Sequence, residues 1–272
     1  MFDNNVEPIN LTRYLINLIT FILICLVLII WQLTFIPKAL ASVDDTNNPV
    51  KIGSFLTPGL IEEDGTGLLN KLNNALFMEM NKNVELNLSS VNRVRRGINN
   101  GQLDGYFPEL WENLPGKKTQ YVVSRPFFYK RVILFTLKSS GLTKLSEFEN
   151  KHLGVVKGFS YGKRIKSNPH LSLSFQKDDI TNINMLLNGR FSGVLGGYPG
   201  TVIAVKGNNR TNEIHYDLDK PVAILESFYA CKNNPDGVKL CNSITKAIES
   251  LLRKGVLELN EETGFSRFNP PE

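Results

Sequence analysis

Two short stretches of the chain place side chains that could bind a small molecule directly after strand-like runs. Glu109 and Trp111 follow the run LDGYF closely, and they combine a carboxylate with an indole. Gly158 and Ser160 follow the run LGVV and precede a short helix-like run, so backbone N–H groups there would suit an anion. A few polar groups set beside aromatic rings are typical of a ligand pocket.

The same rule of position selects the remaining candidates. In open α/β sheets, ligands sit beyond the carboxyl ends of the strands. Four loops meet that condition, at residues 54–57, 108–111, 158–161 and 196–198. Together they give seven candidate ligand-binding residues: Phe55, Glu109, Trp111, Gly158, Phe159, Ser160 and Tyr198. The simpler alternatives are core packing for the phenylalanine and the tryptophan, and a solvated loop charge for Glu109.

A basic cluster beside the first stretch raises a different possibility, which is nucleic-acid binding. Arg93, Arg95 and Arg96 lie in the helix-like run VNRVRRG. The net charge is only +5, from 31 basic and 26 acidic residues, and a nucleic-acid surface needs a second basic face or stacking aromatics. We therefore expect these arginines to form the solvated face of a helix, and we expect no nucleic-acid partner.

Catalysis and metal binding have little support in the residue pattern. The sequence has no Ser-His-Asp set, nucleophile elbow or phosphate loop, and Glu109 is its only obvious general acid or base. His152, His170 and His215 are isolated, with no Cys/His spacing that resembles a zinc site. The sequence therefore predicts a non-enzymatic protein without cofactor or metal.

Alternating strand-like and helix-like runs must position these loops. From residue 50 the chain reads strand, amphipathic helix, strand, helix and strand, at residues 50–55, 67–81, 84–88, 90–101 and 103–107. A stripe of apolar residues marks the inner face of the first helix: Leu68, Leu69, Leu72, Leu76 and Met80. Such alternation predicts a parallel sheet flanked by helices.

The same order recurs 88 residues later. The run LLNGRFSGVL aligns with INNGQLDGYF, which superposes Gly189 on Gly101 and Gly193 on Gly105. Asn-Gly ends a helix readily because both residues tolerate left-handed backbone angles. We infer two similar α/β lobes. Two long strand-like runs, within residues 125–138 and 221–234, lead out of the first lobe and back, so they predict a hinge with a ligand cleft between the lobes.

The N-terminus has the composition of an export signal. Residues 14–36 form an uncharged apolar run about long enough to span a bilayer. Ala39 and Ala41 are placed like a cleavage site before Ser42. We favour a mature chain in the periplasm. Because the run is longer than a usual signal core and acidic residues precede it, an inner-membrane anchor at residues 14–36 stays open.

Export leaves two cysteines, Cys231 and Cys241, in the run YACKNNPDGVKLC. An oxidising compartment permits a disulfide between them, and NNPDG reads as a turn that could fold the two ends together. We predict a disulfide, and the alternative is two separate buried thiols.

Several weak motifs, at a consistent spacing, carry a resemblance to a known family. They are VKIGS, GTGLLNKLNNAL, GINNGQLDG, YVVSRPFFYKRVILF, GLTKLSEFENKHLGVVKGFSYG, LLNGRFSG and LLRKGVL. Over residues 50–260 the chain resembles the family 3 periplasmic solute-binding proteins, the receptor subunits of polar amino-acid ABC importers, as a divergent member. The resemblance implies a type 2 periplasmic-binding-protein fold, which is α/β with two Rossmann-like lobes joined by two crossing strands. It also implies a monomer that captures a small polar ligand and works with ABC-transporter membrane subunits or another membrane protein.

Two positions depart from the pattern of amino-acid binders in that family. Those proteins usually carry an arginine shortly before the VVSRPFF-like stretch, and the matching position here is Lys117, a candidate ligand contact that supplies charge without the planar fork. They also usually carry an aspartate after the second-lobe strand for the α-ammonium group, where this chain has Gly197. A standard α-amino acid held in the standard way is therefore not expected.

The predicted organisation has five parts: a signal peptide or anchor at residues 1–41, a linker at 42–49, lobe 1 at 50–128, lobe 2 at 129–225, and a return to lobe 1 at 226–272. The predicted function is a periplasmic binding protein that captures a small polar, amino-acid-like ligand for an ABC importer. Two alternatives stay open. One is a membrane-tethered sensory or orphan module of the same fold, and the other is a cyclohexadienyl-dehydratase-like enzyme that uses Glu109 as its acid or base.

Overall fold

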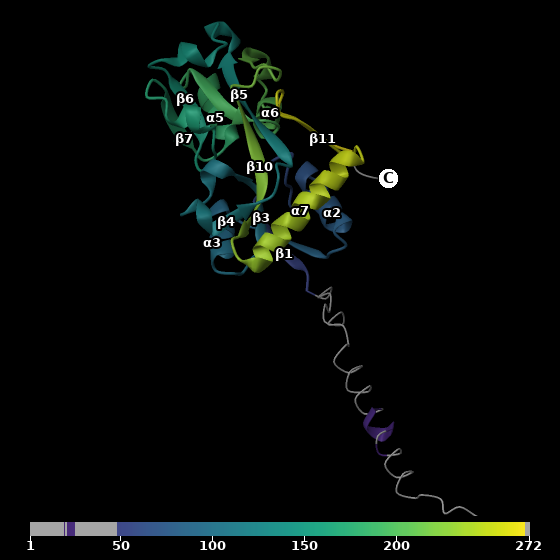
Figure 1. Cartoon of the computed structure of the whole chain (residues 1–272). Helices are drawn as coiled ribbons and strands as arrows, with labels where there is room; N and C mark the ends of the chain where they lie inside the picture. Colours follow the sequence, from purple (N-terminus) through teal and green to yellow (C-terminus); the bar gives the residue numbers. More distant parts are fainter. Residues whose placement is uncertain (1–18, 20, 25–47, 270–272) are drawn as a thin grey trace, which may run out of the picture. The chain divides into compact units, whose positions relative to one another are not determined.

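A computed structural model describes residues 19, 21–24 and 48–269 of the chain (Figure 1). Ile19 and residues 21–24 are helical, and the rest of the apolar run predicted at residues 14–36 lies outside the described residues. Among the described residues, no helix combines the length and the apolar composition that a membrane span requires. The elements discussed below belong to one compact unit, Asn47–Glu272.

Lobe 1 is built on three parallel strands. Its strands and connecting helices are β1 (Val50–Ser54), α2 (Leu68–Glu79), β2 (Val84–Leu88), α3 (Val91–Asn99) and β3 (Gly105–Leu110). The strand order is β2-β1-β3. The apolar stripe predicted for the first helix is buried at Leu69, Leu72 and Leu76, in a core shared with the C-terminal helix α7 (Pro235–Arg253). Removal of this apolar surface from water is what fixes both helices against the sheet.

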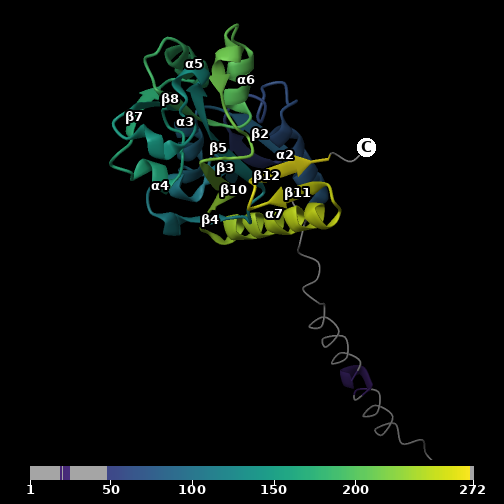
Figure 2. The ribbon, with the colours of Figure 1, turned by 90° about the horizontal axis from the view of Figure 1, so that it is seen from above.

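Lobe 2 repeats the arrangement. Its elements are β6 (His152–Val156), α4 (Lys163–Lys166), β7 (Ser172–Gln176), α5 (Asp179–Leu187), β8 (Gly193–Gly197) and α6 (Gly200–Lys206). The strands are parallel in the order β7-β6-β8. Helices α5 and α6 lie together (Figure 2) and share a core of their own with β8. Each lobe therefore has its own apolar core, as independent α/β units require.

Two long antiparallel strands join the lobes, β5 (Phe128–Leu137) and β10 (Ala223–Lys232), as Figure 1 shows. Beyond their shared segment, β10 pairs with β3 and β4 (Tyr121–Val123) of lobe 1, and β5 pairs with β8 and β9 (Ile214–His215) of lobe 2. The sheet thus runs through both lobes in the order β2-β1-β3-β10-β5-β8-β6-β7. The predicted fold class, two α/β lobes joined by two crossing strands, is confirmed, and the predicted lobe limits fall inside these two shared strands.

The repeat seen in the sequence is present in the fold. Gly101 and Gly189 follow α3 and α5 with φ angles of 74° and 70°, the left-handed conformation that ends a helix at glycine. Gly105 and Gly193 begin β3 and β8. The same helix–turn–strand unit therefore delivers a loop to the cleft from each lobe.

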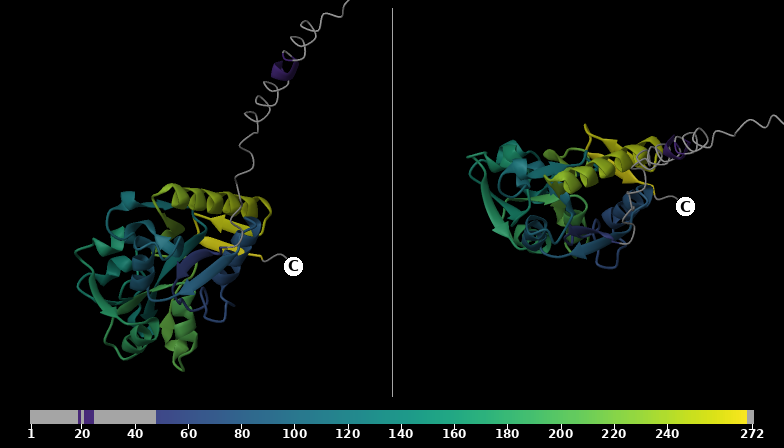
Figure 3. Two further views of the ribbon diagram at one scale, coloured as in Figure 1. Left: turned by 90° about the horizontal axis from the view of Figure 1, so that it is seen from below. Right: turned by 60° about the horizontal axis from the view of Figure 1, so that its bottom comes forward.

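Several short elements were not predicted from the sequence. They are α6, β4, β9, the hairpin of β11 (Leu257–Asn260) and β12 (Phe265–Phe268), and 3-10 turns at Trp111–Asn113, Lys118–Gln120 and Thr211–Glu213. The hairpin lies beside α7 (Figures 2 and 3) and buries Leu257 and Phe268 in the core of lobe 1.

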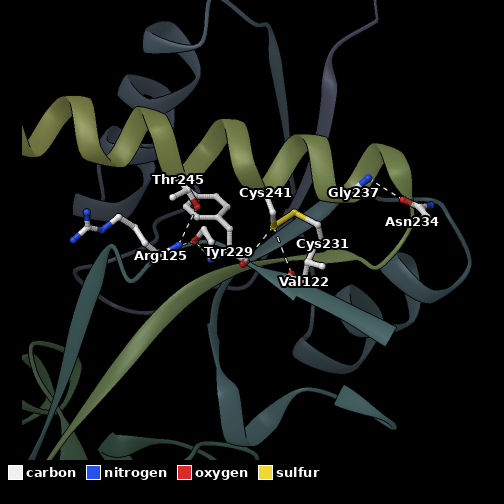
Figure 4. Close-up of a disulfide and its surroundings, with 9 residues drawn as sticks. Val122, Arg125, Tyr229, Cys231, Asn234, Gly237, Cys241 and Thr245 are labelled. Atoms are coloured by element: carbon white, nitrogen blue, oxygen red, sulfur yellow. Dashed lines mark hydrogen bonds between the residues drawn. A yellow bond between two sulfur atoms is a disulfide. The ribbon is translucent and has the colours of Figure 1, made fainter. Parts of the chain in front are cut away.

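The predicted disulfide is present and joins Cys231 of β10 to Cys241 of α7 (Figure 4). The predicted turn at NNPDG is wrong. Asn234 instead caps α7, its side-chain oxygen accepting a hydrogen bond from the N–H of Gly237 at 2.8 Å. Pro235 follows in the first turn, where a missing N–H leaves no bond unmade. The helix therefore begins at Pro235 and includes Cys241.

Reduction of this disulfide should destabilise the protein. The two cysteines are separated by 10 positions, and loop-closure entropy for a short loop corresponds to ~2–3 kcal/mol. Denaturant unfolding with and without dithiothreitol measures this difference in the free energy of unfolding. A double variant, Cys231→Ala with Cys241→Ala, is the control, because it should not respond to dithiothreitol. Equal responses of the two proteins would contradict the prediction.

Candidate ligand-binding site

A cavity of about 750 Å³ lies between the two lobes. Residues from all four segments selected by the strand-end rule line it, at the carboxyl ends of β1, β3, β6 and β8. The prediction that residues 108–110 and Gly197 lie in loops is wrong, because β3 continues to Leu110 and β8 to Gly197. The volume is within the range of small-molecule sites in proteins. The carboxyl ends of the parallel strands of both lobes thus meet at one cavity.

Six of the eight predicted ligand-binding residues line this cavity: Phe55, Glu109, Gly158, Phe159, Ser160 and Tyr198. Trp111 and Lys117 do not line it. The chain leaves β3 at Leu110 and enters a 3-10 turn, so Trp111 is 46% exposed, with the ammonium group of Lys118 5.0 Å from its ring. Lys117 is also exposed. The cavity therefore gives neither residue the predicted ligand contact.

Glu109 belongs to a closed hydrogen-bond network in the cavity wall. Its carboxylate accepts two hydrogen bonds from the Arg95 guanidinium, at 2.9 and 3.0 Å. It also accepts from the Tyr106 hydroxyl and from its neighbour's backbone N–H at Leu110, each at 2.9 Å. The side chain of Glu109 is 3% exposed. Burial, reinforced by this carboxylate, raises the pKa of Tyr106 far above its ordinary value, so the phenol stays a donor.

The prediction that all three arginines of α3 face solvent is therefore wrong at Arg95. Arg93 and Arg96 are exposed, but the side chain of Arg95 is only 19% exposed. Arg95 lies four residues after Val91, which also lines the cavity, and residues four apart share a helix face. The helix thus turns Arg95 toward Glu109.

Substitution of Glu109 should show that this network stabilises lobe 1. Glu109→Gln leaves a largely desolvated guanidinium without its counter-charge, which should lower the free energy of unfolding by ~2–3 kcal/mol. Glu249→Gln is the matched control, because the Arg125–Glu249 pair is exposed on both sides at 3.6 Å, and such pairs contribute under ~0.5–1 kcal/mol. Urea unfolding compares the two variants, and equal losses would contradict the account.

Lys130 supplies a second charge at the cavity, from the hinge strand β5. Its ammonium group donates a hydrogen bond to the backbone oxygen of Ser160 at 2.9 Å and lies 5.0 Å from the ring of Phe159 and 5.1 Å from that of Tyr161. A side-chain carbon at Gly197 would lie 3.0 Å from Cε of Lys130. Glycine at position 197 therefore leaves the space that the lysine side chain uses.

Lys130 faces an acidic neighbour without forming an ion pair with it. Asp179, the first residue of α5, lines the cavity and accepts a hydrogen bond from the Thr201 hydroxyl at 2.8 Å. Burial lowers the pKa of Lys130 to about 8, while the Asp179 carboxylate acts to raise it. Burial likewise raises the pKa of Asp179, against the effects of Thr201 and Lys130. Within residues 48–269 neither charge has an ion-pair partner, so both remain available at the cavity.

Lys130 should titrate near pH 8 in the folded protein. The ¹³Cε signal of this lysine, assigned by its loss in Lys130→Arg, measures that pKa directly by NMR. Asp179→Asn should move the pKa further down, because the neutral amide no longer stabilises the ammonium group. Asp217→Asn, a change at a partly exposed residue that does not line the cavity, should leave it unchanged. A titration near 10.5, the ordinary lysine value, would contradict the burial of this group.

The two lobes also contact each other at two places. Glu112 of lobe 1 accepts hydrogen bonds from the Ser160 hydroxyl at 3.1 Å and from the backbone N–H of Lys163 at 3.2 Å. Gly59 of lobe 1 also lies close to Ile203 of lobe 2: a Cβ atom at position 59 would be 2.7 Å from Cδ1 of Ile203. The φ angle of Gly59 is 77°. The anion site predicted around Ser160 thus faces a carboxylate of the protein itself.

Sequence reasoning missed three charged residues of this region. Asp179 follows β7, so the strand-end rule would have selected it had that strand been included. Lys130 gives one signal, a charge inside an apolar strand run, but its position in mid-strand falls outside the rule. Glu112 carries no signal, because its partners come from the other lobe.

No family model matches the chain, and no curated protein matches it. Solved structures do match. The GluR0 ligand-binding core in complex with L-glutamate has a TM-score of 0.64 and 16% identity, over 77% of this chain and 94% of that chain. The arginine-, lysine-, histidine-binding protein ArtJ from Geobacillus stearothermophilus has a TM-score of 0.59 and 17% identity, over 76% and 91%. A histidine kinase sensor domain with similarity to periplasmic binding proteins has a TM-score of 0.61 and 16% identity, over 78% and 93%.

The chain has the periplasmic-binding-protein fold. Both lobes carry the strand order second, first, third, followed by an antiparallel strand. In this example of the periplasmic-binding-protein fold, the cavity lies at the carboxyl ends of the strands of both lobes and beside the two joining strands. At identities of 16–17% the likeness concerns the fold.

Proposed function

We propose that the chain is an extracytoplasmic solute-binding protein, a divergent member of family 3, that captures a small organic ligand between its lobes. The observation that carries the proposal is the cavity of about 750 Å³ between two lobes whose sheets are joined through β5 and β10. Matching structures are described as binding glutamate or basic amino acids, which supports an amino-acid-like size for the ligand.

Capture would work as a population shift between more open and more closed arrangements of the lobes. A ligand that contacts both lobes favours the closed arrangement by its differential affinity. Contacts such as that of Glu112 with Ser160 and Lys163 link the lobes directly. The closed form would then present the ligand to a membrane partner, either ABC-transporter subunits or another membrane protein, from the periplasm.

We propose a structural role for Glu109 rather than a catalytic one. A general acid or base needs a free oxygen within reach of its substrate. Four hydrogen bonds from the protein already meet the Glu109 carboxylate. This engagement favours a structural anion over the acid or base that a dehydratase would need.

A second candidate, a sensory module tethered to the membrane, is favoured by the similarity to the histidine kinase sensor domain. The two functions share the cleft and differ in the N-terminus. Sequencing of the exported protein from its own cells separates them: a chain that starts near Ser42 indicates a soluble receptor, and one that retains Met1 indicates a tether.

Ligand binding should stabilise the folded protein. At a hundredfold excess over Kd, a ligand adds about 2.7 kcal/mol, which corresponds to a rise in Tm of roughly 5–10 °C for a chain of this size. Thermal-shift screening of the purified full-length chain against amino acids, organic acids, oligoamines and sugars should find such a compound.

A cavity-filling variant provides the control. Ile180 lines the cavity and is 63% exposed, whereas Met78 is 77% exposed on α2 and does not line it. Ile180→Trp should abolish the thermal shift, and Met78→Trp should keep it. No shift with any compound, or an equal shift in Ile180→Trp, would contradict the proposed function.

A further inference from the structure

Apolar side chains form a large part of the cavity walls. They come from both lobes, including Phe55, Leu110 and Phe128 from one lobe and Phe159, Ile180 and Ile203 from the other. Ile180 and Ile203 are 63% and 45% exposed. Burial of such surface against a ligand is worth roughly 25 cal/mol per Å², so the walls favour a ligand with a hydrocarbon or aromatic body.

Most charges at the cavity already neutralise one another. Seven charged side chains line it: Arg95, Glu109, Lys130, Lys157, Lys177, Asp178 and Asp179. Arg95 pairs with Glu109, and Lys177 lies 3.7 Å from Asp178. Among residues 48–269 this leaves Lys130, Lys157 and Asp179 without an ion-pair partner. Lys157 is exposed, but Lys130 is partly buried.

The ammonium group of Lys130 has donors to spare. It carries three N–H groups, and within the described part of the chain its one hydrogen bond goes to the backbone oxygen of Ser160. The rings of Phe159 and Tyr161 lie beside it and offer a favourable surface for a cation, but they carry no counter-charge. A carboxylate would supply that charge through short, charge-assisted hydrogen bonds, which are about twice as strong as neutral ones.

We propose that the ligand is an organic acid with an apolar body and that the ammonium group of Lys130 binds its carboxylate. This proposal rests on the proposed function and names the chemical class of its ligand. The apolar body lies against side chains of both lobes, and the carboxylate contacts Lys130 on the hinge strand β5. One molecule thus contacts both lobes and the strand that joins them.

The position of Asp179 is consistent with this orientation. One of its oxygens accepts from Thr201, and the other makes no hydrogen bond within residues 48–269, so it can accept from a hydroxyl or another donor on the ligand. A ligand ammonium group placed next to Lys130 would instead meet a like charge, which disfavours binding of simple amines at that position.

Isothermal titration of the purified full-length chain with matched compounds tests the assignment. The acids are hexanoate and 3-phenylpropanoate, the neutral controls are hexanamide and 3-phenylpropanamide, and the cationic control is hexylamine. The acids should bind at least tenfold more tightly than their amides and than hexylamine. Lys130→Met should weaken binding of the acids at least tenfold, whereas Lys157→Met, which removes the exposed cavity lysine, should change it less than threefold.

A measurement on the unmodified protein keeps the test independent of how Lys130→Met folds. Binding of hexanoate should raise the pKa that the ¹³Cε signal of Lys130 reports, because a carboxylate stabilises the ammonium form. An unchanged pKa at saturating hexanoate would overturn the role of Lys130, and so would equal binding of the acids to Lys130→Met.

The outcomes separate this proposal from the one it rests on. If none of the acids binds while another class of compound stabilises the protein and loses that effect in Ile180→Trp, the organic-acid proposal is overturned and the solute-binding function stands. If no compound of any class binds the cavity, the solute-binding function itself fails.

Discussion

The antiparallel pairing of β5 with β10 is the constraint on which the rest of the structure depends. One end of β10 pairs with β3 of lobe 1, and one end of β5 pairs with β8 of lobe 2. The other ends of β5 and β10 pair with each other. Each lobe buries its own apolar core, so neither needs the other for its interior. The lobes therefore have separate cores and meet at β5 and β10, and a cavity lies where the carboxyl ends of their strands face each other.

The same strand pair brings a charge to that cavity. Lys130 lies on β5 at the passage between the lobes, where burial lowers its pKa to about 8. A partly desolvated ammonium group opposes stability unless something compensates for the lost hydration. Here a carbonyl and two aromatic rings compensate in part, and Asp179 contributes from a distance. Because groups held in this way are concentrated at functional sites, we propose the hinge lysine, rather than the network of Arg95 and Glu109, as the charge that recognises the ligand.

The sequence was sufficient for the fold because the fold rests on local periodicity. The leucine stripe of α2 and the glycines at 101 and 189 can be recognised from a few neighbouring residues, without knowledge of distant contacts. The loops around Ser160 and Tyr198 were found because the ends of parallel strands share one edge of a sheet. Trp111 does not line the cavity because β3 continues to Leu110 and a 3-10 turn follows, and alternation alone does not determine how far a strand continues.

The pairing of charged side chains could not be predicted in the same way. Arg95 and Glu109 lie on a helix and a strand, 14 positions apart, and meet only through the packing of α3 on the sheet. The contact of Glu112 with Ser160 depends on the distance between the lobes. The residue types in NNPDG suit both a free turn and a capped helix start. The structure shows the helix start, because α7 continues from Pro235 through Cys241.

The central claim is that a ligand binds between the lobes and contacts both. Hydrogen–deuterium exchange of the full-length chain, with and without the compound that most raises its Tm, tests this most directly. The account predicts slower exchange at residues 55–60 of lobe 1 and at residues 156–163 of lobe 2 together, with little change at the hairpin β11–β12, which does not line the cavity. Protection confined to one lobe, or at a surface away from the cavity, would contradict it.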